Sequence, residues 1–591
     1  MPSEPLRDPD LGSRPVRWRG AVLALALYGL LAVLLYARAW AAPTDTWAGN
    51  LGDPAGFMWL LSRTPGVVTN LHAAFFTNNV NYPFGINLMW APNVPLLAVL
   101  AWPVTHFWGP VAAYDTLMTG GFAFSAWAAF FAARRFAASD LGAALAGLLY
   151  GFSPYMVGHG YGHLNITFVV IPPLLLLVLD EVFRRQRLSP YLVGAVLAAL
   201  AAAQFFISQE IILSSGVIAL VGLVVLVLTR WREIRSRARY VSICFAVALP
   251  IFALAVAYPA RIMFTGPQRL GTFPTDPYVN DLLTFVVPPP TLRLAGISAL
   301  APWRHWSGNP AEWNGYLGLP LLVLLCVAAF ALRRNPRARF FAIMAALSAV
   351  LSMGAFLHVN GLVTAVPLPW WLAANLPITR DMEAARLMLF GYLFAGVLVA
   401  MLVDAFRPSW RRLAPTAAVL LLAAVTLVPR GYAGHHVPQP AFFATRHAAD
   451  VPYRSVALVA PVASPANTDL DMFQPMLWLA EGNHYCIAES PIAGNDPEGR
   501  PLAGTTPTTL AQVLIQVEAG APPPRLTPAL QAQLTEDLRS RRVGTVIVGP
   551  MRHEAETVEL LTSLLGRPPA FHDGVYVWSS APGANEGSGC A

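Results

Sequence analysis

The fold class follows from residues 20–40, which read GAVLALALYGLLAVLLYARAW and contain one charged residue, Arg38. A polar, arginine-containing segment of 19 residues precedes this stretch. An apolar helix of about 20 residues is long enough to cross the roughly 30 Å hydrocarbon core of a bilayer. A cleaved signal peptide is the alternative, because Ala39-Trp40-Ala41 loosely resembles a cleavage site. Many similar apolar runs follow, and they favour a retained first membrane span.

The composition extends this interpretation to most of the chain. Of the 591 residues, 56% are hydrophobic and 12% are charged, and the mean hydropathy is +0.52. Soluble globular proteins carry about a quarter charged residues. The composition therefore excludes a soluble enzyme with a single anchor and predicts an α-helical polytopic membrane protein.

Arginine sets the predicted orientation, because all 39 basic residues are arginine and cytoplasmic loops are enriched in basic side chains. The basic balance is explained by loop orientation, so we expect no nucleic-acid partner. Six clusters stand between apolar runs: Arg7–Arg19, Arg134–Arg135, Arg184–Arg187, Arg230–Arg239, Arg333–Arg339 and Arg407–Arg412. If all six are cytoplasmic, a helical hairpin must join each adjacent pair. The N-terminus is then inside and the C-terminus outside, with eleven spans near 20–40, 111–133, 139–156, 164–183, 190–206, 208–229, 240–260, 315–332, 338–357, 386–406 and 413–429.

One long apolar stretch, residues 91–108, does not fit as a crossing, since counting it would invert every later cluster. Pro92, Pro95 and Pro103 interrupt it. We therefore predict a helix that lies at the outer surface or re-enters. Residues 367–377, with Trp370 and Trp371 as interfacial anchors, are a second such piece.

The predicted organisation has three parts. Residues 1–19 form a cytoplasmic segment, and residues 20–429 form the transmembrane domain, with a first outer loop at 41–110. Residues 430–591 are predicted to form a small extracytoplasmic α/β domain, because short strand-like runs occur near 456–459, 543–548 and 575–578 and a helical pattern near 554–566. A disulfide between Cys486 and Cys590 is compatible with that location, whereas Cys244 and Cys326 lie in apolar runs.

The first outer loop carries the candidate catalytic residues Asp53 and, eight residues earlier, Asp45. An acid at a helix start beside the membrane can act as a general base that removes a proton from an attacking hydroxyl. Asp53 can instead simply cap the following helix, with Pro54 at the first helical position. The two roles are compatible.

His159 and His163 lie in the glycine-rich segment GHGYGH, four residues apart. On a regular helix they would share one face, as metal ligands do, but the glycines disfavour a regular helix and no third ligand is evident. We expect a loop whose histidines contact an anionic group. The alternative is that these polar residues only stabilise a turn. No cofactor is expected, and a divalent metal is left open.

Ionisable residues near span ends complete the candidate substrate-binding set. They are Arg261, Glu312, Arg380 and Arg386, with Glu210 at an outer turn. Charges inside membranes are costly and often functional, although the cost falls near the interface. Arg380 and Arg386 can instead simply form ion pairs with Asp381 and Glu383.

Three stretches carry a family resemblance: Gly52-Asp53-Pro54 with Trp59, then Asn81-Tyr82-Pro83, and Ser153-Pro154-Tyr155 with His163. Together they resemble bacterial multi-span proteins of the GT-C glycosyltransferase superfamily, near the RgtA/B/C/D-like and YfhO-like proteins. The resemblance covers about residues 20–410.

This resemblance implies a GT-C core in the bacterial inner membrane, a catalytic acid in the first outer loop at Asp53, and surface helices in that loop. The arginine clusters give this core about 11 spans. The resemblance also implies a polyprenyl-phosphate-linked sugar donor, a glycan, lipid or protein acceptor, and contact with membrane lipids. Many such enzymes carry two nearby acids, whereas Asp45 is eight residues away, so a paired role is in doubt. Since fold transfers better than activity, a non-catalytic lipid- or glycan-handling protein and a transporter remain alternatives.

Overall fold

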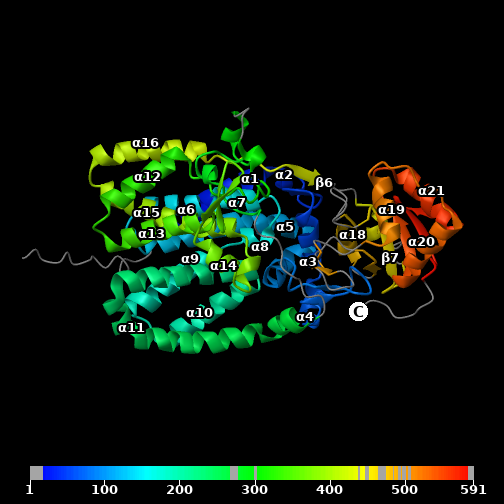
Figure 1. Ribbon diagram of the computed structural model, residues 1–591, viewed down its shortest axis with the longest axis horizontal. Coiled ribbons are helices and arrows are strands. Elements are labelled where there is room, and N and C mark those ends of the chain that lie inside the picture. The colour runs from blue at the N-terminus through cyan, green and yellow to red at the C-terminus, as the bar shows by residue number, and fades with distance from the viewer. Residues whose placement is uncertain are drawn as a thin grey trace, which may run out of the picture. The chain divides into compact units, whose positions relative to one another are not determined.

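The computed structural model describes residues 18–266, 277–297, 302–436, 439–445, 451–462, 474–482, 485–489, 494–495, 501–502 and 507–583 (Figure 1). It divides into two compact units. Unit 1 consists of Met1–Ala37, Met118–Ala255 and Pro274–Tyr432. Unit 2 consists of Arg38–Leu117, Val256–Phe273 and Ala433–Ala591.

Unit 1 is predominantly helical. Its helices are α1 (Trp18–Leu35), the second part of α5 (Pro95–Arg134) from Met118 onward, α6 (Asp140–Gly151), α7 (Pro154–His159), α8 (Leu164–Thr167), α9 (Ile171–Asp180), the π-helix η2 (Glu181–Arg185), α10 (Pro190–Phe205), most of α11 (Gln209–Thr265), α12 (Gly318–Ala331), α13 (Pro336–Leu351), α14 (Trp370–Ala374), α15 (Met388–Phe406) and α16 (Trp410–Thr426). Short 3₁₀ turns η3 (Leu282–Phe285), η4 (Arg293–Ile297), η5 (Pro302–His305), η6 (Thr379–Asp381) and η7 (Ala384–Leu387) and the hairpin β4 (Phe356–Val359)–β5 (Leu362–Pro367) connect them.

Each of the eleven segments predicted to span the membrane overlaps a helix. Among the described residues, six helical segments are long and apolar enough to cross a bilayer, and α10 and α12 are shorter apolar helices. The chain is therefore a helical protein with several membrane-spanning segments. The number of crossings stays a prediction.

Helix α15 is the centre of unit 1, because every residue from Met388 to Val403 is buried. It packs against α6, α12 and α13 (Figure 1). Small residues allow the closest approach: a Cβ on Gly142 of α6 would lie 3.0 Å from the carbonyl oxygen of Ala400, and one on Gly396 would lie 3.0 Å from that of Ala146. Small residues at helix interfaces are typical of membrane proteins, where dispersion contacts replace the hydrophobic effect.

The apolar stretch at 91–108 begins the long helix α5, and that helix is broken. Gly109 has φ 85° and ψ 171°, which are not helical, and Pro110 follows it. A positive φ is readily adopted by glycine alone. Residues 95–108 therefore form a helical piece distinct from the one after the break, and its placement at the outer surface stays a prediction. The second such stretch contains α14, in which Trp370 is buried and Trp371 is exposed.

Unit 2 combines the first outer loop with a sheet. Its loop elements are α2 (Ala37–Trp40), β1 (Thr46–Ala48), α3 (Asp53–Ser62), α4 (Thr64–Thr69), β2 (Phe76–Thr77) and β3 (Ile86–Asn87). The remaining elements are β6 (Gly434–His436), α17 (Ala441–Ala444), β7 (Val456–Ala460), α18 (Gln474–Gly482), β8 (Cys486–Ile487), β9 (Gly494–Asn495), β10 (Pro501–Leu502), α19 (Thr509–Glu518), α20 (Pro528–Ser540), β11 (Val543–Val548), α21 (Glu554–Leu565), β12 (Ala570–His572) and β13 (Val575–Ser579).

A five-stranded sheet has the order β12-β13-β11-β7-β8. Strand β11 pairs with β7 in parallel and with β13 in antiparallel orientation. All six residues of β11 are buried, as expected for a central strand covered on both faces. Helices α19, α20 and α21 pack against one another, and Leu514, Leu534 and Leu561 join the same core. The strands predicted near 456–459, 543–548 and 575–578 and the helix near 554–566 are present.

The substitution Gly151→Ala is expected to lower the melting temperature. Its Cβ would lie 2.8 Å from the backbone nitrogen and Cα of Ala126, so α5 and α6 would have to move apart. Overpacking of this kind costs about 1–3 kcal/mol. Thermal unfolding in detergent, followed by fluorescence, measures the effect.

The matched control is Gly29→Ala on α1, where a new Cβ meets nothing within 4 Å. Alanine there raises helix propensity by roughly 1 kcal/mol, so this variant should melt at or above the wild-type temperature. A Gly151→Ala protein as stable as the wild type would contradict the close approach of the two helices.

Candidate functional site

Asp53 is the first residue of α3 in unit 2, and the N-cap position belongs to Gly52. No side chain caps this helix start, and Pro54 occupies the first turn. The capping role that the sequence left open is therefore not performed by the Asp53 carboxylate in the geometry of an N-cap. An acid in the first turn is still favoured by the helix dipole, and the residue is half-buried.

The turn before Asp53 is held by hydrogen bonds within the loop. The Trp47 indole donates to the Asn50 carbonyl at 2.8 Å, and the Gly52 amide donates to Asn50 Oδ1 at 3.1 Å. On the other side, Trp59 in α3 is fully buried, and α3 packs against α18. The acid is thus carried on a fixed helix start and not on a loose loop.

Asp45, the other predicted catalytic acid, is exposed just before β1. Its carboxylate accepts a hydrogen bond from the Thr44 hydroxyl at 3.2 Å. Strand β1 pairs with β6, and the His436 ring lies 3.0 Å from the Asp45 carbonyl oxygen. Asp45 therefore presents its carboxylate to the surface beside a short strand.

Asp115, which the sequence reasoning missed, is a buried acid in the same unit. It is 0% exposed and lies on α5, six residues after the break at Gly109. Its Oδ1 accepts a hydrogen bond from the Ala48 amide at 3.3 Å, and its Oδ2 has no hydrogen-bond partner among the described residues. The signal was present in the sequence, because a lone acid in an apolar run is costly and often functional.

In unit 1, Arg386 is the centre of an ion-pair cluster that the sequence predicted only in part. Its guanidinium pairs with Glu312 at 2.8 Å, with Glu383 at 2.9 Å and also with Glu210. His159 Nε2 lies 3.7 Å from a Glu312 carboxylate oxygen. We call these residues the Arg386 cluster.

The cluster collects side chains from separate elements. Arg386 stands on the 3₁₀ turn η7 that leads into α15, and Glu210 is the second residue of α11. His159 ends α7, and its Nδ1 lies 3.3 Å from Nδ1 of His163. Of the predicted substrate-binding residues, the structure thus brings together His159, His163, Glu312 and Arg386.

The cluster holds more carboxylates than cations. Burial would raise the pKa of Glu312, but Arg386, helped by His159, holds it at about 2. Burial, opposed by Arg386 and reinforced by Glu312 and Glu210, raises the pKa of Glu383 to about 9. Glu383 is therefore protonated at neutral pH, because one guanidinium does not compensate three buried carboxylates.

The remaining predicted residues lie elsewhere. Arg380 is half-exposed and pairs with Asp381 at 3.7 Å, so both local contacts considered from the sequence are present, although Glu383 contacts Arg386 in its protonated form at neutral pH. Arg261 is exposed near the end of α11 and belongs to unit 2, as does Asp53. Within the described ranges, no group of three or more histidine, cysteine or acidic side chains is arranged to hold a metal ion.

Residues 69–428 match the model of a family described as a domain of unknown function, DUF6311. No curated protein sequence matches the chain. The chain is similar in structure to the arabinofuranosyltransferase AftD from Mycobacteria, with a TM-score of 0.54 and 17% identity over 97% of this chain and 40% of AftD. This likeness shows that the two chains share a fold.

Two further structures are similar at lower scores. The oligosaccharyltransferase AglB from Archaeoglobus fulgidus has a TM-score of 0.44 and 11% identity over 90% of this chain and 69% of the AglB chain. ArnT from Cupriavidus metallidurans has a TM-score of 0.37 and 13% identity over 95% of this chain and 98% of ArnT. The chain spans about two fifths of the length of AftD.

The substitution Glu383→Gln is expected to flatten the dependence of stability on pH. Folded Glu383 keeps its proton up to about pH 9, whereas the unfolded chain loses it near pH 4.5. Between these values the folded state binds more protons, so wild-type stability falls as the pH rises. Glutamine cannot ionise and removes this part of the slope. Melting temperatures at about pH 5, 7 and 9 measure it.

Glu312→Gln is the contrasting variant. Glu312 is ionised across this whole pH range. Its replacement by glutamine removes a charged partner of Arg386, so the variant should melt at a lower temperature at every pH. The expected loss of stability is about 3–5 kcal/mol. If the melting temperature of Glu383→Gln depends on pH as steeply as that of the wild type, Glu383 is not the residue that keeps its proton in the folded state.

Proposed function

Because the chain belongs to the DUF6311 family and has the GT-C fold, we propose that it is an inverting glycosyltransferase. It would move a sugar from a polyprenyl-phosphate donor to a glycan, lipid or protein acceptor of the cell envelope, on the outer face of the bacterial inner membrane. Asp53 would be the general base.

The observation that carries this proposal is the position of Asp53. Its carboxylate stands at a fixed helix start, is half-buried and does not serve as the N-cap. A general base needs a defined position and access to the acceptor hydroxyl. The fixed and half-buried position of Asp53 supports it for this role, whereas Asp45 is exposed and Asp115 is 0% exposed.

The proposed reaction is one displacement. Asp53 takes the proton of the acceptor hydroxyl while that oxygen attacks the anomeric carbon, and the bond from this carbon to the lipid phosphate breaks. The phosphate leaves with the bonding electron pair, and the configuration at the carbon inverts. A single lipid phosphate can leave without a metal when preorganised cations stabilise its developing charge.

Arg261 is the cation that we assign to the donor phosphate. It is exposed, and it belongs to the same unit as Asp53. Arg386 suits this role less well, because its guanidinium already faces three carboxylates. We propose that Arg386, with Glu312 and His159, positions the ends of the helices that carry them.

Asp115 would act through the loop that bears the base. Its hydrogen bond to the Ala48 amide ties α5 to the segment that ends at Asp53. In this proposal Asp115 is a positioning residue that holds the loop bearing Asp53, and it does not contact the substrate.

The proposed orientation has eleven spans, the N-terminus in the cytoplasm and the C-terminal sheet outside. Cys486 is disulfide-bonded, which suits an oxidising compartment, although Cys590, its predicted partner, lies outside the described residues. Cys244 and Cys326 are free thiols.

Asp53→Asn is expected to reduce transfer by at least about 100-fold, since general base catalysis contributes roughly 10²–10⁴. Cells that lack the protein and cells that carry the variant should share one profile of envelope glycans and lipid-linked sugars by mass spectrometry. Asp45→Asn, at equal protein level, is the matched control and should keep the wild-type profile. Full activity of Asp53→Asn would show that Asp53 is not the general base. An unchanged glycan profile in cells that lack the protein would contradict the proposed function itself.

The orientation predicts which positions a membrane-impermeant thiol reagent can reach. Phe571→Cys on β12 is at a position 60% exposed and should be labelled in intact spheroplasts. Trp410→Cys, in the last arginine cluster and at a position 77% exposed, should be labelled only after permeabilisation. The parent chain with its native cysteines gives the background. The reverse pattern would invert the topology.

A further inference from the structure

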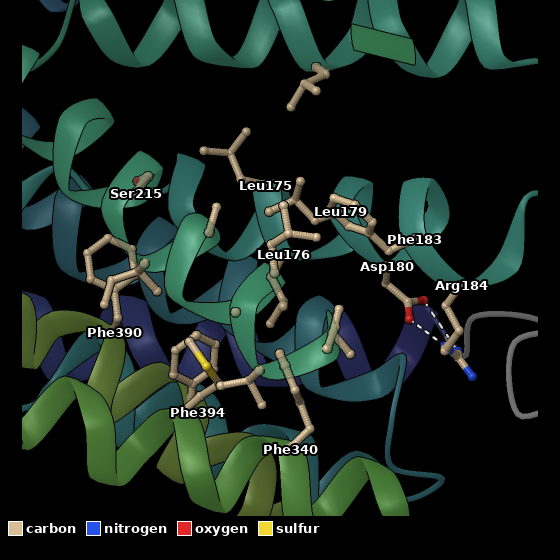
Figure 2. Close-up of a pocket in the computed structure, with 18 of the residues that line it drawn as sticks. Leu175, Leu176, Leu179, Asp180, Phe183, Arg184, Ser215, Phe340, Phe390 and Phe394 are labelled. Atoms are coloured by element: carbon tan, nitrogen blue, oxygen red, sulfur yellow. Dashed lines mark hydrogen bonds and ion pairs between the residues drawn. The ribbon is translucent and has the colours of Figure 1, made fainter. Parts of the chain in front are cut away.

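Unit 1 contains a cavity of about 940 Å³ that the proposed reaction does not use. Helices α9, α10, α11, α13 and α15 line it. Figure 2 shows Leu175, Leu176 and Leu179 on one side, Phe340, Phe390 and Phe394 on the other, and Asp180 with Arg184 at one end. Ligand pockets usually measure about 300–1,000 Å³, so this cavity is large enough for a lipid-sized apolar group.

One end of the cavity is strongly basic. Seven arginines line it, from three of the clusters predicted to be cytoplasmic: Arg184, Arg185, Arg187, Arg230, Arg237, Arg337 and Arg339. The acids that line it are Asp180 and Glu233. Asp180 pairs with Arg184 at 2.5 Å, and Glu233 pairs with Arg230 at 3.0 Å and with Arg237 at 3.1 Å. A positive excess therefore remains at this end, which we call the arginine rim.

Arg339 is the clearest unpaired member of the rim. It is exposed on α13, and its guanidinium has no carboxylate partner within the part of the chain that the structure describes. The guanidinium is a planar fork that binds phosphate oxygens well. A cation at the mouth of an apolar cavity between membrane helices fits a ligand with an anionic head and an apolar tail.

We propose that this cavity binds an anionic glycerophospholipid, with an acyl chain among the apolar side chains and its phosphate at the arginine rim. Basic pockets between membrane helices on the cytoplasmic side recognise such head groups. The proposal does not depend on glycosyl transfer.

The rim lies at the membrane end opposite the Arg386 cluster. The first part of α11 runs from Gln209, beside Glu210, to the non-helical Arg230. At 1.5 Å per residue this stretch is about 30 Å long, the thickness of the hydrocarbon core. With the proposed orientation, the bound lipid belongs to the cytoplasmic leaflet and is distinct from a donor used at the outer face.

Native mass spectrometry of the full-length protein, with equal amounts of phosphatidylglycerol and phosphatidylcholine of identical chains, tests the head group. The wild type should retain phosphatidylglycerol preferentially, and Arg339→Gln should reduce that preference by about fivefold. Arg334→Gln is the matched control, because Arg334 is exposed in the same cluster and does not line the cavity. Equal retention of both lipids by the wild type, or an equal effect of the two substitutions, would overturn the proposal.

The tail is tested with Gly216→Phe. Gly216 lines the cavity on α11, and a Cβ there meets nothing within 4 Å, so the ring would fill the space meant for the acyl chain. This variant should retain several-fold less phosphatidylglycerol. Gly29→Phe on α1, also open within 4 Å but outside the cavity, should retain the wild-type amount.

Photo-crosslinking of the wild-type protein keeps the proposal testable if Gly216→Phe misfolds. Phosphatidylglycerol with a photoreactive acyl chain should label peptides of α9 and α13. Labelling confined to other helices would overturn the proposal. Displacement of phosphatidylglycerol by an equal amount of polyprenyl phosphate would also overturn it, because the cavity would then belong to another lipid.

Discussion

The cost of removing charge from water governs this structure more than any other constraint. In hydrocarbon a charge survives only when it is paired or reaches the interface. Arg386 is the clearest case, since its side chain is only 13% exposed and its guanidinium faces Glu210, Glu312 and Glu383. The cluster links the start of α11, the loop before α12 and the start of α15, which belongs to the most buried of the candidate membrane spans among the described residues. Its excess of acid requires a retained proton, so a change of protonation there changes how these helix ends are held together.

The same cost explains how much of the fold the sequence predicts. A membrane-embedded backbone must satisfy its own hydrogen bonds, so apolar runs near twenty residues become helices, and every predicted span overlaps one. Local chemistry also predicts the break in α5, because Gly109-Pro110 follows the proline-containing stretch. Helix packing is less visible in sequence, since the contact of Gly396 with Ala146 joins residues that no periodicity connects.

The candidate site is predicted less completely, for a physical reason. Asp53, His159, Glu312 and Arg386 stand out because they are polar residues beside apolar runs. Their partners are set by tertiary contacts, such as the ion pair of Arg386 with Glu210, 176 residues earlier. Asp115 escapes notice because one acid barely changes the hydropathy of a helix, and its hydrogen bond to Ala48 spans 67 residues. Sequence also left the role of Asp53 open, whereas the structure assigns the N-cap to Gly52.

The two ends of the helices in unit 1 are therefore chemically opposite. The end at Glu210 collects carboxylates around one guanidinium, whereas the end at Arg230 collects arginines from three clusters around an apolar cavity. The sequence analysis places each arginine cluster on the cytoplasmic side of the membrane separately. It does not require that clusters from different parts of the chain lie close together. Their convergence on one cavity shows that the end of α9, the middle of α11 near Arg230 and the start of α13 lie together. A negative head group would be repelled at the acidic end and attracted at the basic one, so the charge pattern that orients the helices also determines where an anionic lipid can bind.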